Sequence, residues 1–171
     1  MNARSRHLFL GVLTLGLLIV MTRGAAAESG EQRFITQAAI GGLAEVEMGK
    51  LAGAKASSSE VKQFAAQMVS DHTKANEQLE KIATGKSLKA PSTLDAGDKA
   101  KIEMLSKKTG AEFDKAYVQA QVAGHERMQQ LLAAEATNGK DADLKMFAEK
   151  TLPTVKEHYQ MAMDLQAKVG K

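Results

Sequence analysis

Residues 60–84 read EVKQFAAQMVSDHTKANEQLEKIAT, and this stretch sets the expected fold. Its apolar residues recur at intervals of three and four, which is the period of one face of an α-helix. One such stripe contains Val61, Phe64, Ala65, Met68, His72, Ala75 and Leu79. Neither proline nor glycine interrupts the run. The stretch therefore predicts a long amphipathic helix that carries a histidine on its apolar side.

The same period predicts further helices on both sides of this one. They cover residues 31–56, 94–108, 111–137 and 141–169. Turn-forming residues mark the breaks: Ser57 with Glu60 at capping-box spacing, a loop from Gly85 to Pro91, and stop signals at Gly110 and Asn138-Gly139. Pro153 falls inside the last helix and is expected to kink or split it.

The lengths of the connections predict how these helices pack. Short connections join 31–56 to 60–84 and 111–137 to 141–169, so each pair should form an antiparallel hairpin. A long connector, which contains the short helix, joins the two hairpins. This order predicts an all-α, ferritin-like four-helix bundle. The alternative is a plain up-down bundle with a decorated middle loop.

The N-terminal segment, residues 1–27, has the three parts of a secretory signal peptide. Arg4 and Arg6 precede an apolar run at residues 8–21, and three alanines follow at residues 25–27. Because the run is shorter than the roughly 20 residues that a membrane-spanning helix needs, cleavage after residue 27 is expected. An uncleaved N-terminal anchor is the alternative. Cleavage would leave residues 28–171 as a single helical-bundle domain, soluble in a bacterial periplasm and without a transmembrane span.

Composition excludes several classes of partner and chemistry. The 23 basic residues exceed the 20 acidic ones, but Arg4, Arg6 and Arg23 lie in the predicted signal segment, so the mature chain is balanced. With 4% aromatic residues and no net charge, it is not expected to bind nucleic acid. Because the chain has no cysteine, disulfides, thiolate metal sites and a cysteine nucleophile are excluded.

Three histidines and one glutamate form the candidate metal site: Glu45, His72, His125 and His158. Each lies within about one turn of the midpoint of a different long helix, taking ~3.6 residues per turn. Antiparallel helices of similar length bring their midpoints to one level, so the four side chains can share a layer. Three imidazoles and a carboxylate can bind zinc, iron or copper.

An acid stands next to each histidine: Asp71, Glu126 and Glu157. Neighbouring residues diverge by about 100° around a helix. These acids are therefore expected at most to hydrogen-bond to a metal-binding histidine and orient its ring, without binding the metal themselves. His125 is expected on the shoulder of its apolar stripe rather than at its centre.

Other interpretations of the histidines remain open. They can be structural residues that only hydrogen-bond to a neighbour, or they can form a protonation switch. A di-iron oxidase site is less favoured than either, because it needs Glu-x-x-His and the residue three before each histidine is valine: Val69, Val122 and Val155. The seven methionines after residue 27 are expected to fill the core rather than bind copper. Gly41, Gly42, Gly49 and Gly53 are expected to allow close helix contact.

Several stretches together carry a resemblance to a known family. They are Phe34 with Ala38-Ala39, EVEMGKLA at 45–52, VKQFA at 61–65 with MVSDH at 68–72, GAEFD at 110–114, His125, and Phe147-Ala148 with TLP at 151–153 and His158. As a set they resemble the bacterial envelope family called domain of unknown function 4142, over residues 33–168. The resemblance implies an exported, ferritin-like protein, periplasmic or associated with the outer membrane. No agreed activity comes with it.

Two functional hypotheses follow. The first is a non-catalytic periplasmic bundle that binds a metal ion or an envelope partner and contributes to envelope or stress physiology. The second is a metal-dependent enzyme or metal-handling protein that uses the layer of Glu45, His72, His125 and His158.

Overall fold

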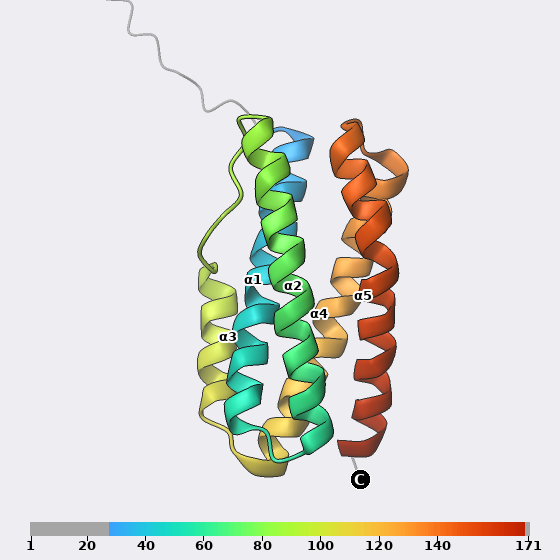
Figure 1. Ribbon diagram of the computed structural model, residues 1–171. Helices are drawn as coiled ribbons and strands as arrows, with labels where there is room; N and C mark the ends of the chain where they lie inside the picture. The colour runs from blue at the N-terminus through green and yellow to red at the C-terminus, as the bar shows by residue number, and fades with distance from the viewer. Residues whose placement is uncertain (1–27, 170–171) are drawn as a thin grey trace, which may run out of the picture.

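The computed structural model describes residues 28–169 of the protein (Figure 1). This part of the chain contains five helices and no strand: α1 (Gly30–Lys55), α2 (Ser59–Gly85), α3 (Ala96–Ser106), α4 (Gly110–Asn138) and α5 (Ala142–Val169). The predicted helix ends are confirmed to within two residues. The predicted signal segment, residues 1–27, lies outside the described residues. None of the five helices is long and apolar enough to cross a bilayer.

The helices form a ferritin-like bundle of two hairpins. α1 packs along α2, and α4 packs along α5 (Figure 1). The connector after α2 and helix α3 run back along the outside of α1, so that α4 starts at the same end of the bundle as α2. α2 and α4 therefore point the same way, which a plain up-down bundle does not allow. The crossover also places α3 against α1 and α4.

Asp114 ties the two hairpins together at the end where α2 and α4 begin. Its buried carboxylate accepts hydrogen bonds from the backbone N–H of Ser57 (3.0 Å) and of Ser58 (2.8 Å), and from the Ser57 hydroxyl. The predicted capping box of Ser57 and Glu60 is therefore wrong. Ser58 is the N-cap of α2, and its hydroxyl accepts from the N–H of Val61 at 3.4 Å. The Ser57 side chain instead holds a long-range contact.

An ion-pair cluster ties the hairpins at the opposite end. Lys86, at the end of α2, lies 2.6 Å from Asp141 and 2.7 Å from Asp143, both at the start of α5. These distances join the carboxylate oxygens to the lysine Nζ. Two carboxylates on one lysine raise its pKa, and Lys86 in turn lowers the pKa of Asp141.

Three local expectations differ from the structure. Gly110 does not stop a helix but opens α4, with a left-handed φ of 57°. Pro153 lies inside α5, which continues through it as one helix, so the predicted split into two helices is wrong. The methionines are not all core residues, because Met104, Met146 and Met163 are exposed. These three side chains occupy helix positions that face solvent, where the helical period alone gives no reason for methionine.

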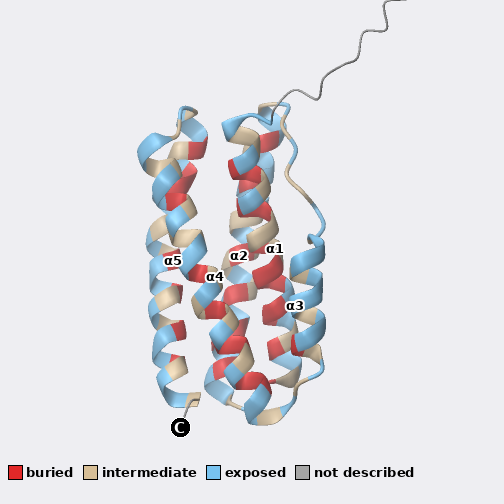
Figure 2. Ribbon diagram, turned by 180° about the vertical axis from the view of Figure 1, so that it is seen from behind, coloured by how far each residue is buried: buried red, intermediate tan, exposed pale blue. Residues whose placement is uncertain are grey.

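The buried residues lie on the inward faces of the helices (Figure 2). Their apolar side chains form two clusters, one towards each end of the bundle. One cluster is centred on Phe64, Phe113 and Tyr117, and the other on Phe34 and Phe147. The histidines fall between the clusters on every helix that carries one. On α2, for example, Met68 belongs to the first cluster and Leu79 to the second, with His72 between them. The core is therefore divided by a polar layer.

Two glycines of α1 provide a matched test of helix packing. A Cβ on Gly49 would lie 2.9 Å from the backbone oxygen of Ala65 on α2, whereas a Cβ on Gly53 would meet nothing within 4 Å. We expect Gly49→Ala to destabilise the protein by about 1–3 kcal/mol, because α1 and α2 must move apart. Gly53→Ala should stabilise it by about 0.5–1 kcal/mol through helix propensity. Urea denaturation measures both, and equal effects of the two substitutions would contradict the close contact at Gly49.

Candidate metal centre

Three histidines from three helices meet in the layer between the two apolar clusters. His72 comes from α2, His125 from α4 and His158 from α5, and their exposed fractions are 6%, 1% and 1%. His125 is thus fully inside the bundle, and its expected place on the shoulder of the α4 stripe is wrong. Its neighbours one and two turns earlier, Gln121 and Tyr117, are also fully buried, so the buried face of α4 runs through all three.

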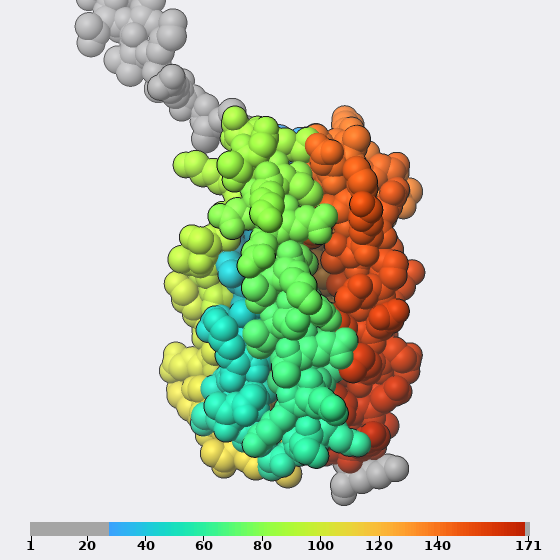
Figure 3. Space-filling model, viewed as in Figure 1, coloured from blue at the N-terminus to red at the C-terminus, as the bar shows by residue number. Residues whose placement is uncertain are grey.

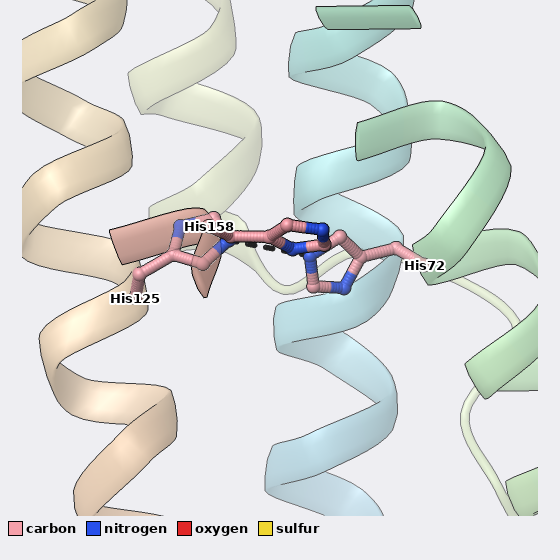
Figure 4. A group of neighbouring side chains, drawn as sticks. All are labelled: His72, His125 and His158. Carbon is pink, nitrogen blue, oxygen red and sulfur yellow. Dashed lines mark hydrogen bonds between the residues drawn. The ribbon is translucent and has the colours of Figure 1, made fainter. Parts of the chain in front are cut away.

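The three rings point toward one another (Figure 4). The Nε2 atoms of His72 and His125 are 3.4 Å apart. The ring centroids are 5.4–5.5 Å apart in all three pairs. Each residue offers one ring nitrogen to a group whose members lie within 4.8 Å of one another. The His72, His125 and His158 side chains are hereafter called the histidine triad.

Hydrogen bonds determine which nitrogen of two rings is free. The Nδ1 of His125 lies 2.9 Å from the carbonyl oxygen of Gln121, which can only accept, so this nitrogen carries the proton. The Nε2 of His158 lies 3.2 Å from a carboxylate oxygen of Asp71 and donates to it in the same way. In neutral rings, the lone pairs are then on Nε2 of His125 and Nδ1 of His158. The latter atom is buried and has no hydrogen-bond partner.

Burial keeps the triad uncharged. It lowers the pKa of His72 to about 3, assisted by repulsion from the other two rings. It lowers the pKa of His125 to about 4, against the opposing hydrogen bond to the Gln121 carbonyl. The pKa of His158 also falls through burial, with Asp71 acting in the opposite direction. Neutral imidazoles are the form of histidine that binds metal ions.

Glu45 is buried at the same level but does not join the triad. Its Oε2 accepts a hydrogen bond of 2.5 Å from Nε2 of Gln121, and its Oε1 lies 4.0 Å from Nδ1 of His125. That nitrogen is the one bound to the Gln121 carbonyl, on the side of the ring away from His72. Burial raises the pKa of Glu45 to about 8, so the carboxyl is largely protonated at neutral pH.

The three acids that adjoin the histidines have different positions. Asp71 is partly buried and contacts His158, although the expectation paired it only with its neighbour His72. Glu126 and Glu157 are exposed on the outer faces of α4 and α5. Glu157 influences His158 only through its charge. Asp71 alone among the three touches a histidine ring through a hydrogen bond in the described chain.

Gln121 belongs to the site, although it was not among the residues predicted from the sequence. Its carbonyl fixes the proton of His125 and its amide holds Glu45, so it connects the two. A signal was present, because Gln121 stands four residues before His125, where a helical residue faces the same side.

Comparisons with known proteins agree with this fold. No curated protein matches the chain. Among solved structures, the chain is similar to "CopM in the Cu(I)-bound form", with a TM-score of 0.69 and 14% sequence identity. The match covers 82% of this chain and 98% of that one, and at this identity it supports the fold. The family described as domain of unknown function (DUF4142) matches residues 20–165. The chain therefore belongs to the DUF4142 family.

Proposed function

We propose that this protein is an exported metal-binding helical bundle. It holds one transition-metal ion at the histidine triad, and copper(I) is the ion we propose. The observation that carries the proposal is the convergence of three buried, neutral imidazoles from three helices. One of them, His158, has a buried Nδ1 without any partner. A buried polar atom without a partner in a native protein calls for an unseen water or ion.

The distances fit a shared ion. Two nitrogens bound at about 2.0–2.1 Å to one tetrahedral ion are about 3.4 Å apart. The Nε2 atoms of His72 and His125 have this separation. The third ring must approach further, since the group as a whole extends to 4.8 Å. A rotation of the His158 side chain would supply this movement.

The surroundings resemble those of known histidine metal sites. A metal-binding histidine usually donates its second N–H to a carboxylate or a backbone carbonyl, which fixes the ring and strengthens the bond to the metal. His158 donates to Asp71 and His125 to the Gln121 carbonyl. Both devices therefore support the proposed role of these rings as ligands.

Charge favours a monovalent ion. Asp71 is the only carboxylate that hydrogen-bonds to a triad ring among residues 28–169, so a single positive charge would be balanced. A divalent ion such as zinc or iron(II) would leave one buried positive charge, which is costly unless Glu45 ionises. Imidazole ligands suit copper, zinc and iron alike. The neighbouring CopM structure is a copper(I)-bound form, which adds support for copper(I).

We place Glu45 outside the ligand set. Its carboxyl is held by Gln121 and faces the protonated edge of His125. Export to the periplasm is part of the proposal and rests on the signal-like segment at residues 1–27. An envelope partner remains a separate proposal, for which the described residues offer no specific observation.

Metal stoichiometry tests the proposal. The mature chain is loaded under anaerobic conditions with copper(I), zinc or iron(II) separately, freed of excess metal, and analysed for metal content. We expect one copper(I) per chain, because the triad is one site. His125→Gln and His158→Gln should each lose this ion, since only two of the three ligand nitrogens remain in each variant. A parent protein without metal, or variants that keep a full equivalent, would contradict the proposal.

The exposed methionines provide the matched control. Thioethers also bind copper(I), so a variant with Met104, Met146 and Met163 changed to leucine must keep its full equivalent. Loss of copper from this variant would show that the exposed methionines, and not the histidine triad, bind the ion. Asp71→Asn should weaken the affinity by about 10–100-fold without changing the stoichiometry, as expected for a residue that orients a ligand.

A further inference from the structure

The histidine triad has no direct opening to solvent, because its three side chains are almost fully buried. An ion that binds there must pass through the bundle. Three hollows in the described part of the chain border the triad, but one of them, enclosed by α1, α2, α4 and α5, has a volume of only about 20 Å³. The other two lie on opposite sides of the triad. Each of these two hollows is a candidate path for the ion between the solvent and the triad.

The larger hollow lies between α1, α3 and α4. It has a volume of about 580 Å³, and both His72 and His125 are among its lining residues. Its outer part is lined by exposed residues of the connector, α3 and α4, so it extends from the surface to two members of the triad. We call it the crossover cavity, because the crossover connection forms one wall.

The smaller hollow lies between α2 and α5, and the seam between these helices faces the viewer in Figure 3. It has a volume of about 240 Å³ and is lined by His72 and His158. Lys74 and Lys150 stand at its mouth, and Asp71 is its only acid. We call it the seam hollow.

We propose that the metal ion reaches and leaves the histidine triad through the crossover cavity and not through the seam hollow. This inference rests on the proposed function, since it concerns the path to the same site.

Charge at the two mouths supports this choice. The crossover cavity has two acids at its mouth, Asp95 and Asp98, against two bases, Lys101 and Arg127. The seam hollow has two lysines against Asp71, whose carboxylate is already bound to His158. A net positive mouth repels a cation, whereas a balanced one does not.

The walls of the crossover cavity offer donors on the way in. Met48 and Met128 contribute thioethers to its lining. Thioethers are soft ligands that suit copper(I), so an ion that loses its water can exchange onto them. The seam hollow has no sulfur among its lining residues.

The wall of the crossover cavity that α3 forms is held to the rest of the bundle by few buried side chains. Leu105 is the only buried residue of α3, and it lies near the far end of the helix from the residues that line the cavity. Gly97, Asp98 and Lys101 are the α3 residues at the cavity, and none of them is buried. Leu94 and Ile102, on either side of this segment, also pack against the first cluster. Outward movement of residues 97–101 therefore exposes no fully buried apolar side chain, which suits a path that must open.

A pair of obstructing variants tests the route. Ala123→Phe places a large side chain at the crossover cavity, on an exposed position of α4 that should tolerate it. Thr154→Phe is the matched control in the seam hollow. Copper(I) in acetonitrile-containing buffer is mixed with the metal-free mature protein, quenched with excess chelator at set times, and bound copper is counted. We expect Ala123→Phe to slow uptake and release at least tenfold, with stoichiometry unchanged, and Thr154→Phe to leave both rates as they are.

The outcomes separate the two claims. If the parent protein takes up no copper, the proposed function fails and the route fails with it. If the parent binds copper but Thr154→Phe alone slows uptake, or both variants slow it equally, the route is overturned and the site stands. Circular dichroism and the final copper content show that each variant is folded. Should Ala123→Phe not fold, Arg127→Glu at the same mouth replaces it, and faster uptake is then expected.

Discussion

Replacing Asp114 with alanine should lower the free energy of unfolding by about 3–5 kcal/mol, because three donors lose a charged acceptor at once. Two of these donors are the backbone N–H groups of Ser57 and Ser58, in the turn between α1 and α2. No other acceptor for them lies in the hydrogen-bond network of the described residues. For a chain of this size, a loss of 3 kcal/mol corresponds to a drop in Tm of about 6–12 °C.

A graded series checks the cause. Asp114→Asn keeps one acceptor oxygen and should cost less than alanine. Asp95→Ala removes an exposed cap, the acceptor for the N–H of Asp98 at 2.7 Å, and should cost only about 1 kcal/mol. Thermal and urea denaturation of the metal-free variants give the comparison. An effect of Asp114→Ala no larger than that of Asp95→Ala would show that the tie between the hairpins contributes little.

The contact of Asp114 also shows where sequence reasoning stops. The helices could be predicted, because apolar period and breaks are local properties, and the bundle followed from the connection lengths. Ser57 and Asp114 are 57 residues apart, however, and nothing local indicates that they meet. The capping-box spacing of Ser57 and Glu60 gave a local alternative, and the long-range acceptor prevailed. A buried carboxylate that accepts three hydrogen bonds outweighs one exposed cap.

The sequence predicted the level along the bundle at which each site residue lies, but not the direction in which each side chain points. Counting residues from the helix midpoints placed Glu45 and the three histidines at one level, and the structure has them there. Whether a side chain faces its neighbours depends on how each helix is turned about its axis. Glu45 is turned toward Gln121 and Asp71 toward His158, and both partners come from other helices. The rotation depends on packing with side chains far along the sequence.

The polar layer is costly for the fold. It interrupts an apolar core with three rings and a buried carboxyl, and among the described residues it leaves Oε1 of Gln121 and Nδ1 of His158 without hydrogen-bond partners. Apolar residues of similar volume at these positions would be expected to make the bundle more stable. The stability cost of this layer is consistent with the metal-binding role proposed above.

The stability of the metal-free protein should pass through a maximum near pH 6.5, because the triad and Glu45 respond to pH in opposite directions. The unfolded chain protonates its histidines near pH 6.5, whereas the folded pKa values of His72 and His125 are about 3 and 4. The unfolded state thus binds more protons below pH 6.5, and stability falls as the pH falls, by up to about 1.4 kcal/mol per pH unit for each ring.

Glu45 acts in the other direction. Its pKa is about 8 in the folded protein and 4.5 in the unfolded chain, where water replaces the buried surroundings. The folded state holds the extra proton between these values, so stability falls as the pH rises, by up to about 1.4 kcal/mol per pH unit. Arg127 and the hydrogen bond from Gln121 oppose the shift but do not cancel it.

Glu45→Gln separates the two contributions. The amide keeps a polar group beside Gln121 and cannot ionise, so the loss of stability above pH 6.5 should disappear. Below pH 6.5, the acid limb of the profile of stability against pH should become steeper, because Glu45 no longer opposes the histidines. Relative to the parent, the variant should gain about 2–3 kcal/mol between pH 5.5 and 7.5. Urea denaturation from pH 4.5 to 9, with chelator present, measures both limbs. Parallel profiles for parent and variant would show that Glu45 is already ionised in the folded protein, and a copper(I) ion on the triad would then have a second carboxylate within reach.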